Sequence, residues 1–572
     1  GNHNIVYANC KGRFGVFDKR TGTERGYYVG AANMYGNNPK DLRYRFQRVS
    51  PIHVSPHNPD VVYHTSQYVH RTTNDGVTWE TISPDLTAFE DDKQVISGSP
   101  ITRDITGEEF YSTIYAIRES SVEAGVIWVG ANDGPVHVTR DGGDSWQDVT
   151  PRGLPAGGRV DSVEPSPHDA AVAYVSVLRY QLGDWKPYAY RTGNYGASWS
   201  LLTDGENGIP ADYPVRVVRE DPERAGLLYA GTEYGMFVSF DDGGSWQSFQ
   251  QNLPVTPITD IKVFRGDLAI STMGRAFWVL DNVATLRQNP LPEMGEEAAL
   301  FAPKETVRYR QTFQNRDPAT VPQYPPPAAT IDYYLPSDVT GSVSLEILSA
   351  DGQSVNAFQS VAEAADDEDA QDSAEQGAGD QDNIVEDMGL NQVRFLDDEE
   401  LKADTGINRF HWDMRHRGAW HEDKEERFDG GPLVRPGTYT VRLSVGDEVY
   451  EQELLIVTDP RVITTGVTNA MIDEQVDLEL KIVELLDRTR RFAADLQEQR
   501  ESVEDDSDRA EALDAALAKL ETEEGTYMPA RLIDQTSYLY QMIANADQAP
   551  GDEAKDRYRV LSEEFAAIEQ SL

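Results

Sequence analysis

The residues with the clearest capacity for chemistry are carboxylates and arginines in one class of turn. Asp133 and Glu233 each follow a short strand-like segment, and two carboxylates at a fixed separation can hydrolyse a glycosidic bond. Arginines in the same region could hold an anionic ligand through paired hydrogen bonds. We therefore take Asp133 and Glu233 as the candidate catalytic pair. The candidate ligand-binding residues are Arg48, Arg159, Arg275, Trp185 and Asn132.

A simpler interpretation accounts for the same residues. Any acidic protein supplies carboxylates in its turns by composition alone, and these residues could be solvated turn residues that shape the loops. Arg48 and Arg159 do occupy equivalent positions, since each precedes a Ser-Pro-His segment by the same offset. The sequence contains no Ser-His-Asp elbow, phosphate-binding loop or zinc signature.

Four near-identical segments are the elements that must position these residues. They span 72–79, 139–146, 192–199 and 239–246, and each reads hydroxyl residue, any, Asp or Asn, any, Gly, any, Ser or Thr, Trp. Gly permits a positive φ, and the Asp or Asn side chain accepts hydrogen bonds from backbone N–H groups, so each segment predicts a tight hairpin. The Trp begins the next strand and packs over the hairpin. The structural residues are Asn74, Trp79, Asp141, Trp146, Asn194, Trp199, Asp241 and Trp246.

These four segments resemble the Asp-box, or bacterial neuraminidase repeat, of sialidases, two-propeller xyloglucanases and sortilin-type receptors. The sequence over 228–246 is similar to that of large bacterial proteins labelled sortilin-like or glycosyl hydrolase. The resemblance covers about half of the chain and implies a β-propeller. It implies no particular activity, because a fold does not fix a function.

The spacing of the boxes predicts propeller blades. The chain repeats a unit of roughly 45 to 65 residues, within the range of a four-stranded blade. Complete blades fit at 51–82, 113–149, 160–202 and 215–249, and partial blades at 6–17 and 261–280. The predicted fold class is mainly β, with a multi-blade β-propeller of four full and two partial blades, an immunoglobulin-like β-sandwich and a C-terminal helical bundle.

The strand order of a blade assigns its turns to two faces. The Asp-box turns join the third strand to the outer strand and share a face with the inner-to-second turns. The second-to-third turns and the crossovers between blades lie on the opposite face, which the resemblance makes the working face. Because open sheet edges aggregate, we expect a missing N-terminal segment or a second chain to complete the propeller. The alternative is a six-blade ring whose two ends share a blade.

Charge and composition restrict the partners. The 572 residues carry a net charge of −46, from 51 Lys and Arg against 97 Asp and Glu. So acidic a chain argues against nucleic acid and anionic membrane as partners, and no apolar run is long enough to span a bilayer. The single cysteine, Cys10, rules out an intrachain disulfide. We expect an extracellular or periplasmic protein whose secretion signal is removed or lies upstream.

The composition changes after the blades. Residues 1–288 form the predicted propeller, 289–328 a stiff Pro-rich linker, 329–460 the sandwich and 461–572 the helical bundle. Within the sandwich, 361–388 contains 11 Asp or Glu and no Lys or Arg, and cannot bury a core. An acidic loop can attract calcium, but its Asp spacing does not match an EF-hand loop, so we predict no cofactor. We interpret His411 to His421 as a packed strand followed by a polar connection, not a metal site.

Three functions remain open from the sequence. The first is recognition of a glycan or polypeptide through the face opposite the Asp-boxes. The second is glycoside hydrolysis by a carboxylate pair on that face. The third is service as a structural module of a larger assembly.

Overall fold

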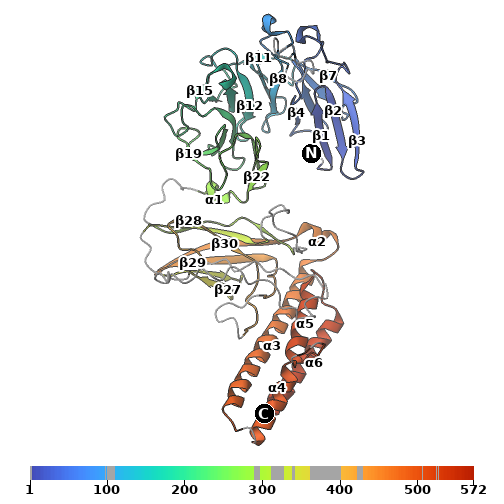
Figure 1. Cartoon of the computed structure of the whole chain (residues 1–572), viewed down its shortest axis with the longest axis vertical. Coiled ribbons are helices and arrows are strands. Elements are labelled where there is room, and N and C mark those ends of the chain that lie inside the picture. The colour runs from blue at the N-terminus through green and yellow to red at the C-terminus, as the bar shows by residue number, and fades with distance from the viewer. Residues whose placement is uncertain are drawn as a thin grey trace. The chain divides into compact units, whose positions relative to one another are not determined.

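The computed structural model describes residues 3–96, 98, 103, 110–288, 297–310, 327–337, 342–360, 401–421, 430–504, 507–523, 525 and 527–572. They divide into two compact units, Gly1–Val283 and Ala284–Leu572 (Figure 1). The first unit contains the repeats, and the second contains a β-sandwich and the helices.

Six antiparallel sheets follow one another along the first unit, and we number them blades 1 to 6. Blade 1 contains β1 (Ile5–Cys10), β2 (Arg13–Asp18) and β3 (Thr23–Tyr28). Blade 2 contains β4 (Ile52–Val54), β5 (Val62–Thr65), β6 (Val69–Thr72) and β7 (Glu80–Thr81). Blade 3 contains β8 (Ile114–Glu119), β9 (Ile127–Ala131), β10 (Val136–Thr139) and β11 (Gln147–Asp148).

The remaining blades repeat this order. Blade 4 contains β12 (Arg159–Pro165), β13 (Ala173–Leu178), β14 (Ala189–Thr192) and β15 (Ser200–Leu201). Blade 5 contains β16 (Val215–Glu220), β17 (Leu228–Thr232), β18 (Met236–Ser239) and β19 (Gln247–Ser248). Blade 6 contains β20 (Ile258–Phe264), β21 (Asp267–Thr272) and β22 (Phe277–Leu280). Each strand pairs with the next in sequence, so the first unit is a propeller with four full and two partial blades, which confirms the predicted fold class.

The apolar faces of the full blades are buried between neighbouring blades. Every residue of the second strands β5, β9, β13 and β17 is buried, since each of these strands is covered on both faces. The end blades differ: Val6 in blade 1 is 41% exposed, and Phe277 and Val279 in blade 6 are 83% and 59% exposed. Blades 1 and 6 are separate sheets, and no extensive packing joins their described strands. The expectation of a shared closing blade is therefore wrong.

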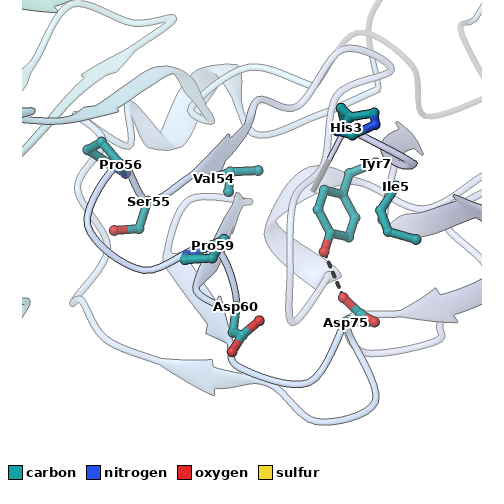
Figure 2. Close-up of a pocket in the computed structure, with 9 residues that line it drawn as sticks. All are labelled: His3, Ile5, Tyr7, Val54, Ser55, Pro56, Pro59, Asp60 and Asp75. Carbon is teal, nitrogen blue, oxygen red and sulfur yellow. Dashed lines mark hydrogen bonds between the residues drawn. The ribbon is translucent and has the colours of Figure 1, made fainter. Parts of the chain in front are cut away.

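A cavity of about 520 Å³ lies between blades 1 and 2 (Figure 2). It is lined from β1 by Ile5 and Tyr7, and from blade 2 by the turn after β4 and by Asp75 of the first Asp-box. It therefore lies on the Asp-box face, where the strand order did not lead us to expect a binding site.

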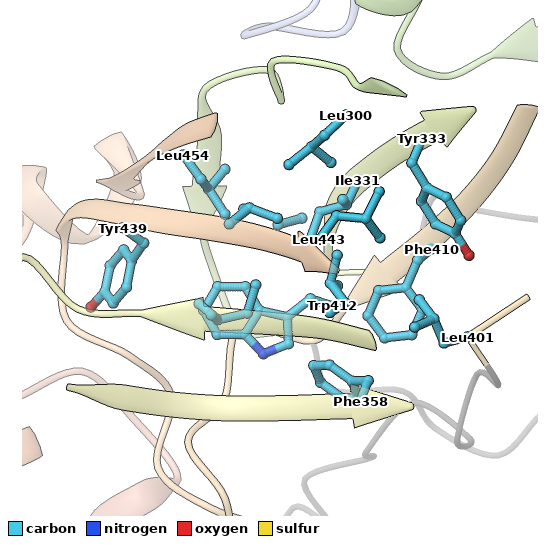
Figure 3. Packing of buried hydrophobic residues seen from close by; sticks show 14 of the residues in the cluster. Leu300, Ile331, Tyr333, Phe358, Leu401, Phe410, Trp412, Tyr439, Leu443 and Leu454 are labelled. Carbon is cyan, nitrogen blue, oxygen red and sulfur yellow. The ribbon is translucent and has the colours of Figure 1, made fainter. Parts of the chain in front are cut away.

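The second unit begins with a two-layer sandwich. One sheet has the order β23 (Ala299–Leu300), β25 (Ala329–Leu335), β28 (Gly406–Trp412). The other has the order β24 (Thr306–Arg308), β30 (Glu448–Thr458), β29 (Gly437–Val445), β26 (Val343–Leu348), β27 (Ser354–Gln359). Figure 3 shows the core between the layers, in which the Trp412 side chain is fully buried and Phe358 lies 4.7 Å from Phe410 between ring centroids.

The sequence predicted a linker before this sandwich and an acidic insert within it. Strands β23 and β24 fall within the proposed linker 289–328, and β24 pairs in parallel with β30, so part of that segment belongs to the sandwich. The prediction of a stiff linker was wrong for these residues. It was based on the prolines later in the segment, and the two strands are too short to show a clear sequence pattern. The acidic insert 361–388 lies outside the described residues.

Helices complete the second unit. They are α1 (Ala284–Arg287), α2 (Pro460–Thr464), α3 (Asn469–Glu501), α4 (Asp508–Leu520), α5 (Leu532–Ala544) and α6 (Asp552–Gln570). Thr468 and Ser507 cap α3 and α4 by accepting a hydrogen bond from a first-turn N–H group. The apolar stripes of α3 to α6 meet in one core that includes Ile482, Leu513 and Phe565. Among the described residues, none of these helices has the length and apolarity that crossing a membrane requires.

Candidate functional site

The Asp-box turns are closed by their own side chains. In the second box, Thr139 Oγ1 donates to Asp141 Oδ1 at 2.7 Å and accepts from Gly143 N at 3.0 Å, while Ser145 N donates to the same carboxylate at 2.9 Å. The hydrogen bonds from Ser145 and Thr139 lower the pKa of Asp141 to about 2, so the turn is held by an ionised carboxylate. The hydroxyl groups and the carboxylate of the motif are thus used within the turn.

The box Trp joins each blade to the one before it. Trp146 Nε1 donates to Ile82 O at 2.8 Å, and Trp199 Nε1 donates to Val149 O at 2.6 Å. Trp246 repeats the contact at 3.1 Å, whereas Nε1 of Trp79 is buried without a hydrogen-bond partner among the described residues. The tryptophans therefore pack against the preceding blade as well as their own hairpin.

The opposite face contains a chain of ion pairs. Arg159 at the start of β12 pairs with Asp161, and Arg216 of β16 lies 3.4 Å from Asp161 Oδ2. Arg216 Nη2 also lies 2.6 Å from Glu233 Oε1, on the turn between β17 and β18. The four side chains are largely buried, with exposed fractions from 5% to 18%. We call Arg159, Asp161, Arg216 and Glu233 the ion chain.

The position of the ion chain follows from the propeller. Inner strands surround the axis, and the first residues of β12 and β16 lie at their crossover ends, next to the second-to-third turn that holds Glu233. Burial raises the pKa of the Asp161 carboxyl, and the guanidinium groups of Arg159 and Arg216 oppose that rise. The guanidinium of Arg216 thus bridges the carboxylates of Asp161 and Glu233.

Aromatic rings surround Arg159. Its guanidinium lies 4.5 Å from the centroid of Tyr115, a cation–π geometry. Burial acts to lower the pKa of Arg159, but Asp161 and the tyrosines Tyr115 and Tyr180 raise it above its ordinary value. Tyr180 and Trp185 lie 5.5 Å apart between ring centroids, and Trp185 is 46% exposed.

The loop that presents Trp185 is anchored, although it lies on the surface. Arg179 donates through Nη1 to the carbonyl groups of Pro155, Ala156 and Gly157 at 2.7 to 2.9 Å. Its Nε donates to Asp184 Oδ2 at 3.0 Å. The aromatic pair is therefore fixed before any ligand arrives, which reduces the entropy lost on binding.

Asp133 and Asn132 hold a crossover in place. Asp133 Oδ2 accepts hydrogen bonds from the N–H groups of Ala88 and Phe89 at 3.0 and 3.3 Å, and the residue is 2% exposed. Asn132 accepts from Thr113 N at 2.9 Å and donates to Phe110 O at 3.1 Å. Burial raises the pKa of Asp133, although its hydrogen bonds oppose the rise.

The structure brings only some of the predicted site residues together. Glu233 and Arg159 are joined through Arg216 and Asp161 in the ion chain. Trp185 lies on the loop that Arg179 anchors, where its ring contacts Tyr180. Asp133 and Asn132 lie in the turn between β9 and β10 and bind the crossover that precedes blade 3. Arg48 and Arg275 are exposed residues of blades 2 and 6, before β4 and between β21 and β22.

Asp161 and Arg216 were missed by sequence reasoning. Each lies inside a strand with apolar neighbours, whereas the sequence predicted site residues in turns and crossovers. A usable signal existed, because Arg159 and Asp161 alternate along one strand and therefore share a side. A second charged set on the inner strands was missed for the same reason: the buried Arg219 lies 2.6 Å from Asp260, which is 53% exposed, and 3.3 Å from Glu164.

Comparison of the sequence with protein-family models and with curated proteins gave no match. Solved structures of similar fold include an ancestral GH74 enzyme, 16% identical with a TM-score of 0.32 over 57% of this chain and 40% of that chain. The GH74 xyloglucanase from Xanthomonas campestris is 14% identical, with a TM-score of 0.31 over 53% of this chain and 43% of that one. PorZ, a surface component of the type-IX secretion system of Porphyromonas gingivalis, is 12% identical, with a TM-score of 0.36 over 80% of this chain and 58% of that one.

These similarities concern the fold alone. This chain spans less than half of the length of either GH74 enzyme named above. The residues of the site are therefore interpreted from their own geometry.

Proposed function

We propose that the protein recognises a glycan or polypeptide through the face opposite its Asp-boxes, with no chemical step. The observation that supports this is the state of the two candidate carboxylates. Glu233 is paired with Arg216 at 2.6 Å, and Asp133 is buried against the backbone of a crossover. Neither is free to act on a substrate, whereas Trp185 is exposed.

The exposed aromatic pair suits a binding surface. An amphipathic ring stacks on the apolar face of a sugar or on a side chain of a peptide, and Tyr and Trp lose little conformational entropy on binding. Tyr180 and Trp185 provide such a surface on the loop that Arg179 anchors. The ion chain would then fix the shape of this face of the propeller and contribute an electrostatic field that acts on the ligand.

Glycoside hydrolysis is the second candidate, and one observation favours it. A general acid needs a raised pKa, and burial raises the pKa of Asp133. Against it, the same burial removes Asp133 from any substrate, and Glu233 is engaged in an ion pair with Arg216. Hydrolysis would require the crossover to open.

The experiment compares the wild-type chain with two variants on an array of neutral and acidic oligosaccharides and on a peptide library. We expect Trp185→Ala to weaken binding at least tenfold, because it removes the exposed ring. Tyr527→Ala is the matched control, since Tyr527 is 84% exposed and belongs to the other unit. Equal binding by Trp185→Ala and the control would contradict the proposed site.

Hydrolysis assays on the same oligosaccharides separate the two candidates. Recognition predicts no turnover by wild type, Asp133→Asn or Glu233→Gln. Turnover by wild type that falls in Asp133→Asn and Glu233→Gln would establish the second candidate instead. We place the protein in an extracellular or periplasmic setting, and the exposed apolar ends of blades 1 and 6 support an additional role as a module of a larger assembly.

A further inference from the structure

Blade 1 presents an open edge to the propeller axis. Its β1 occupies the place of a second strand, because Tyr7 repeats a contact made by Tyr174 of β13. The hydroxyl of Tyr7 donates to Asp75 Oδ1 at 2.7 Å, and that of Tyr174 donates to Asp242 Oδ1 at 2.8 Å, each in the Asp-box of the next blade. In blades 2 to 5 the second strand pairs with an inner strand, whereas no strand among the described residues pairs with the other side of β1.

The backbone of β1 is arranged to accept another strand. Lys19 N donates to Asn4 O at 2.9 Å, so the backbone groups of even-numbered β1 residues face β2. By alternation, the N–H and C=O groups of Ile5, Tyr7 and Asn9 point to the open edge. In the full blades the residue equivalent to Ile5 accepts a hydrogen bond from the inner-to-second turn, as Val61 O does from Ser55 N at 2.9 Å.

The cavity in Figure 2 marks where the turn of such a strand would lie. In blade 2, His57 of this turn donates through Nε2 to Ser120 O of blade 3 at 2.8 Å, and in blade 4 His168 donates to Asp221 O of blade 5 at 2.8 Å. Ser55 is the equivalent residue of blade 2, and it lines the cavity beside Ile5 and Tyr7.

We propose that blade 1 binds an extended polypeptide of the inner-strand type, antiparallel to β1, with its following turn seated in the cavity between blades 1 and 2. Backbone hydrogen bonds to Ile5, Tyr7 and Asn9 provide the affinity, as in other cases of strand addition. A hydrogen-bond donor on the turn reaches the carbonyl of Ser55, and the carboxylates of Asp60 and Asp75 favour a basic group beside it. The bound strand continues the packing of inner strands seen between β12 and β16.

A peptide copied from an inner strand of the same chain can test this proposal. A fluorescent synthetic peptide with the sequence of residues 159–169 contains β12 and its Ser-Pro-His turn. Added to the full chain, it is expected to bind saturably in an anisotropy titration. Hydrogen exchange should slow at least tenfold at the amides of Tyr7 and Asn9, which face the open edge. The same peptide with His168→Ala should bind about fivefold more weakly, the cost of one hydrogen bond.

Two variants of the protein test the edge itself. Asn9→Pro removes one donor that faces the open edge and should weaken the peptide about five- to tenfold, whereas Asn9→Ala removes only the side chain and should bind as wild type does. Equal binding by both variants, or binding with no slowing of exchange in β1, would overturn the proposal. A dimer that protects Tyr7 and Asn9 without peptide would assign the edge to a second copy, which also overturns it.

Discussion

Asp547 is the centre of a buried ionic cluster that fastens the helical bundle to the sandwich. Its Oδ1 lies 2.6 Å from Arg308 Nη1 and 2.8 Å from Arg310 Nε. The side chains of Arg308 and Asp547 are 0% and 3% exposed, and Arg310 is 13% exposed. The substitution Asp547→Asn keeps the shape of the side chain but removes the charge that both guanidinium groups share, so that Arg310 keeps only Glu479, at 3.9 Å.

The loss of stability expected for Asp547→Asn follows from the burial of the cluster. Removing one partner of a buried ion pair costs about 3 to 5 kcal/mol, because the remaining charge is uncompensated. Asp477→Asn is the matched control, since Asp477 pairs with Arg435 at 2.8 Å but is 57% exposed. An exposed pair contributes about 0 to 1 kcal/mol. Each aspartate forms an ion pair with an arginine, but Asp547 is buried and Asp477 is exposed.

Urea unfolding followed by far-ultraviolet circular dichroism measures this difference, because every α-helix among the described residues belongs to the second unit. We expect the free energy of unfolding of that unit to fall at least 2 kcal/mol further for Asp547→Asn than for Asp477→Asn, a conservative bound on the two ranges above. Losses within 1 kcal/mol of each other would refute the assignment of the cluster as buried and essential.

The same cluster predicts the sign of a pH effect. Burial acts to raise the pKa of Asp547, but Arg308 and Arg310 outweigh it, so the pKa lies below its ordinary value. A carboxyl with a depressed folded-state pKa contributes its full stability above its unfolded pKa, and that contribution is lost as pH falls through the folded value. The stability difference between wild type and Asp547→Asn should therefore narrow below about pH 4.

Two further predictions concern the Asp-boxes. Trp146→Phe should destabilise the propeller by about 1 kcal/mol more than Trp79→Phe, because only Trp146 has a described acceptor for its Nε1, and thermal unfolding of both variants checks this. Gly143→Ala should cost about 1 to 3 kcal/mol, since Gly143 has φ +107° and its Cβ would lie 2.7 Å from a carbonyl of blade 2. Gly142→Ala is its control, with φ +72° and open space around a Cβ; equal losses would remove the steric part of the argument.

The blades were predictable because the box motif is local. A hydroxyl, an Asp, a Gly and a Trp within eight residues determine a turn by hydrogen bonds that do not depend on the rest of the chain, as Asp141 and Ser145 show. Once the turns are known, the segments between them can only be the strands of one repeating unit. The helical stripes of α3 to α6 were predictable for a similar reason, since their period is local too.

The candidate site was less accessible to sequence reasoning. Asp133 and Glu233 are both acidic residues that follow a strand, yet one binds backbone N–H groups of a crossover and the other binds Arg216. A turn carboxylate can face solvent or its own loop, and only the path of a distant segment decides between them. The ion chain likewise requires β12 and β16 to lie side by side, which is a property of the tertiary fold.

The most direct test of the account is the footprint of a ligand on the propeller. The strongest binder from the oligosaccharide and peptide arrays is added to the full chain, and amide hydrogen exchange is compared with that of the free protein. We predict slower exchange in 179–187 and 233–235, which contain Trp185 and Glu233, and no change in the Asp-box turn 139–146. Slower exchange confined to the Asp-box turns would contradict the account.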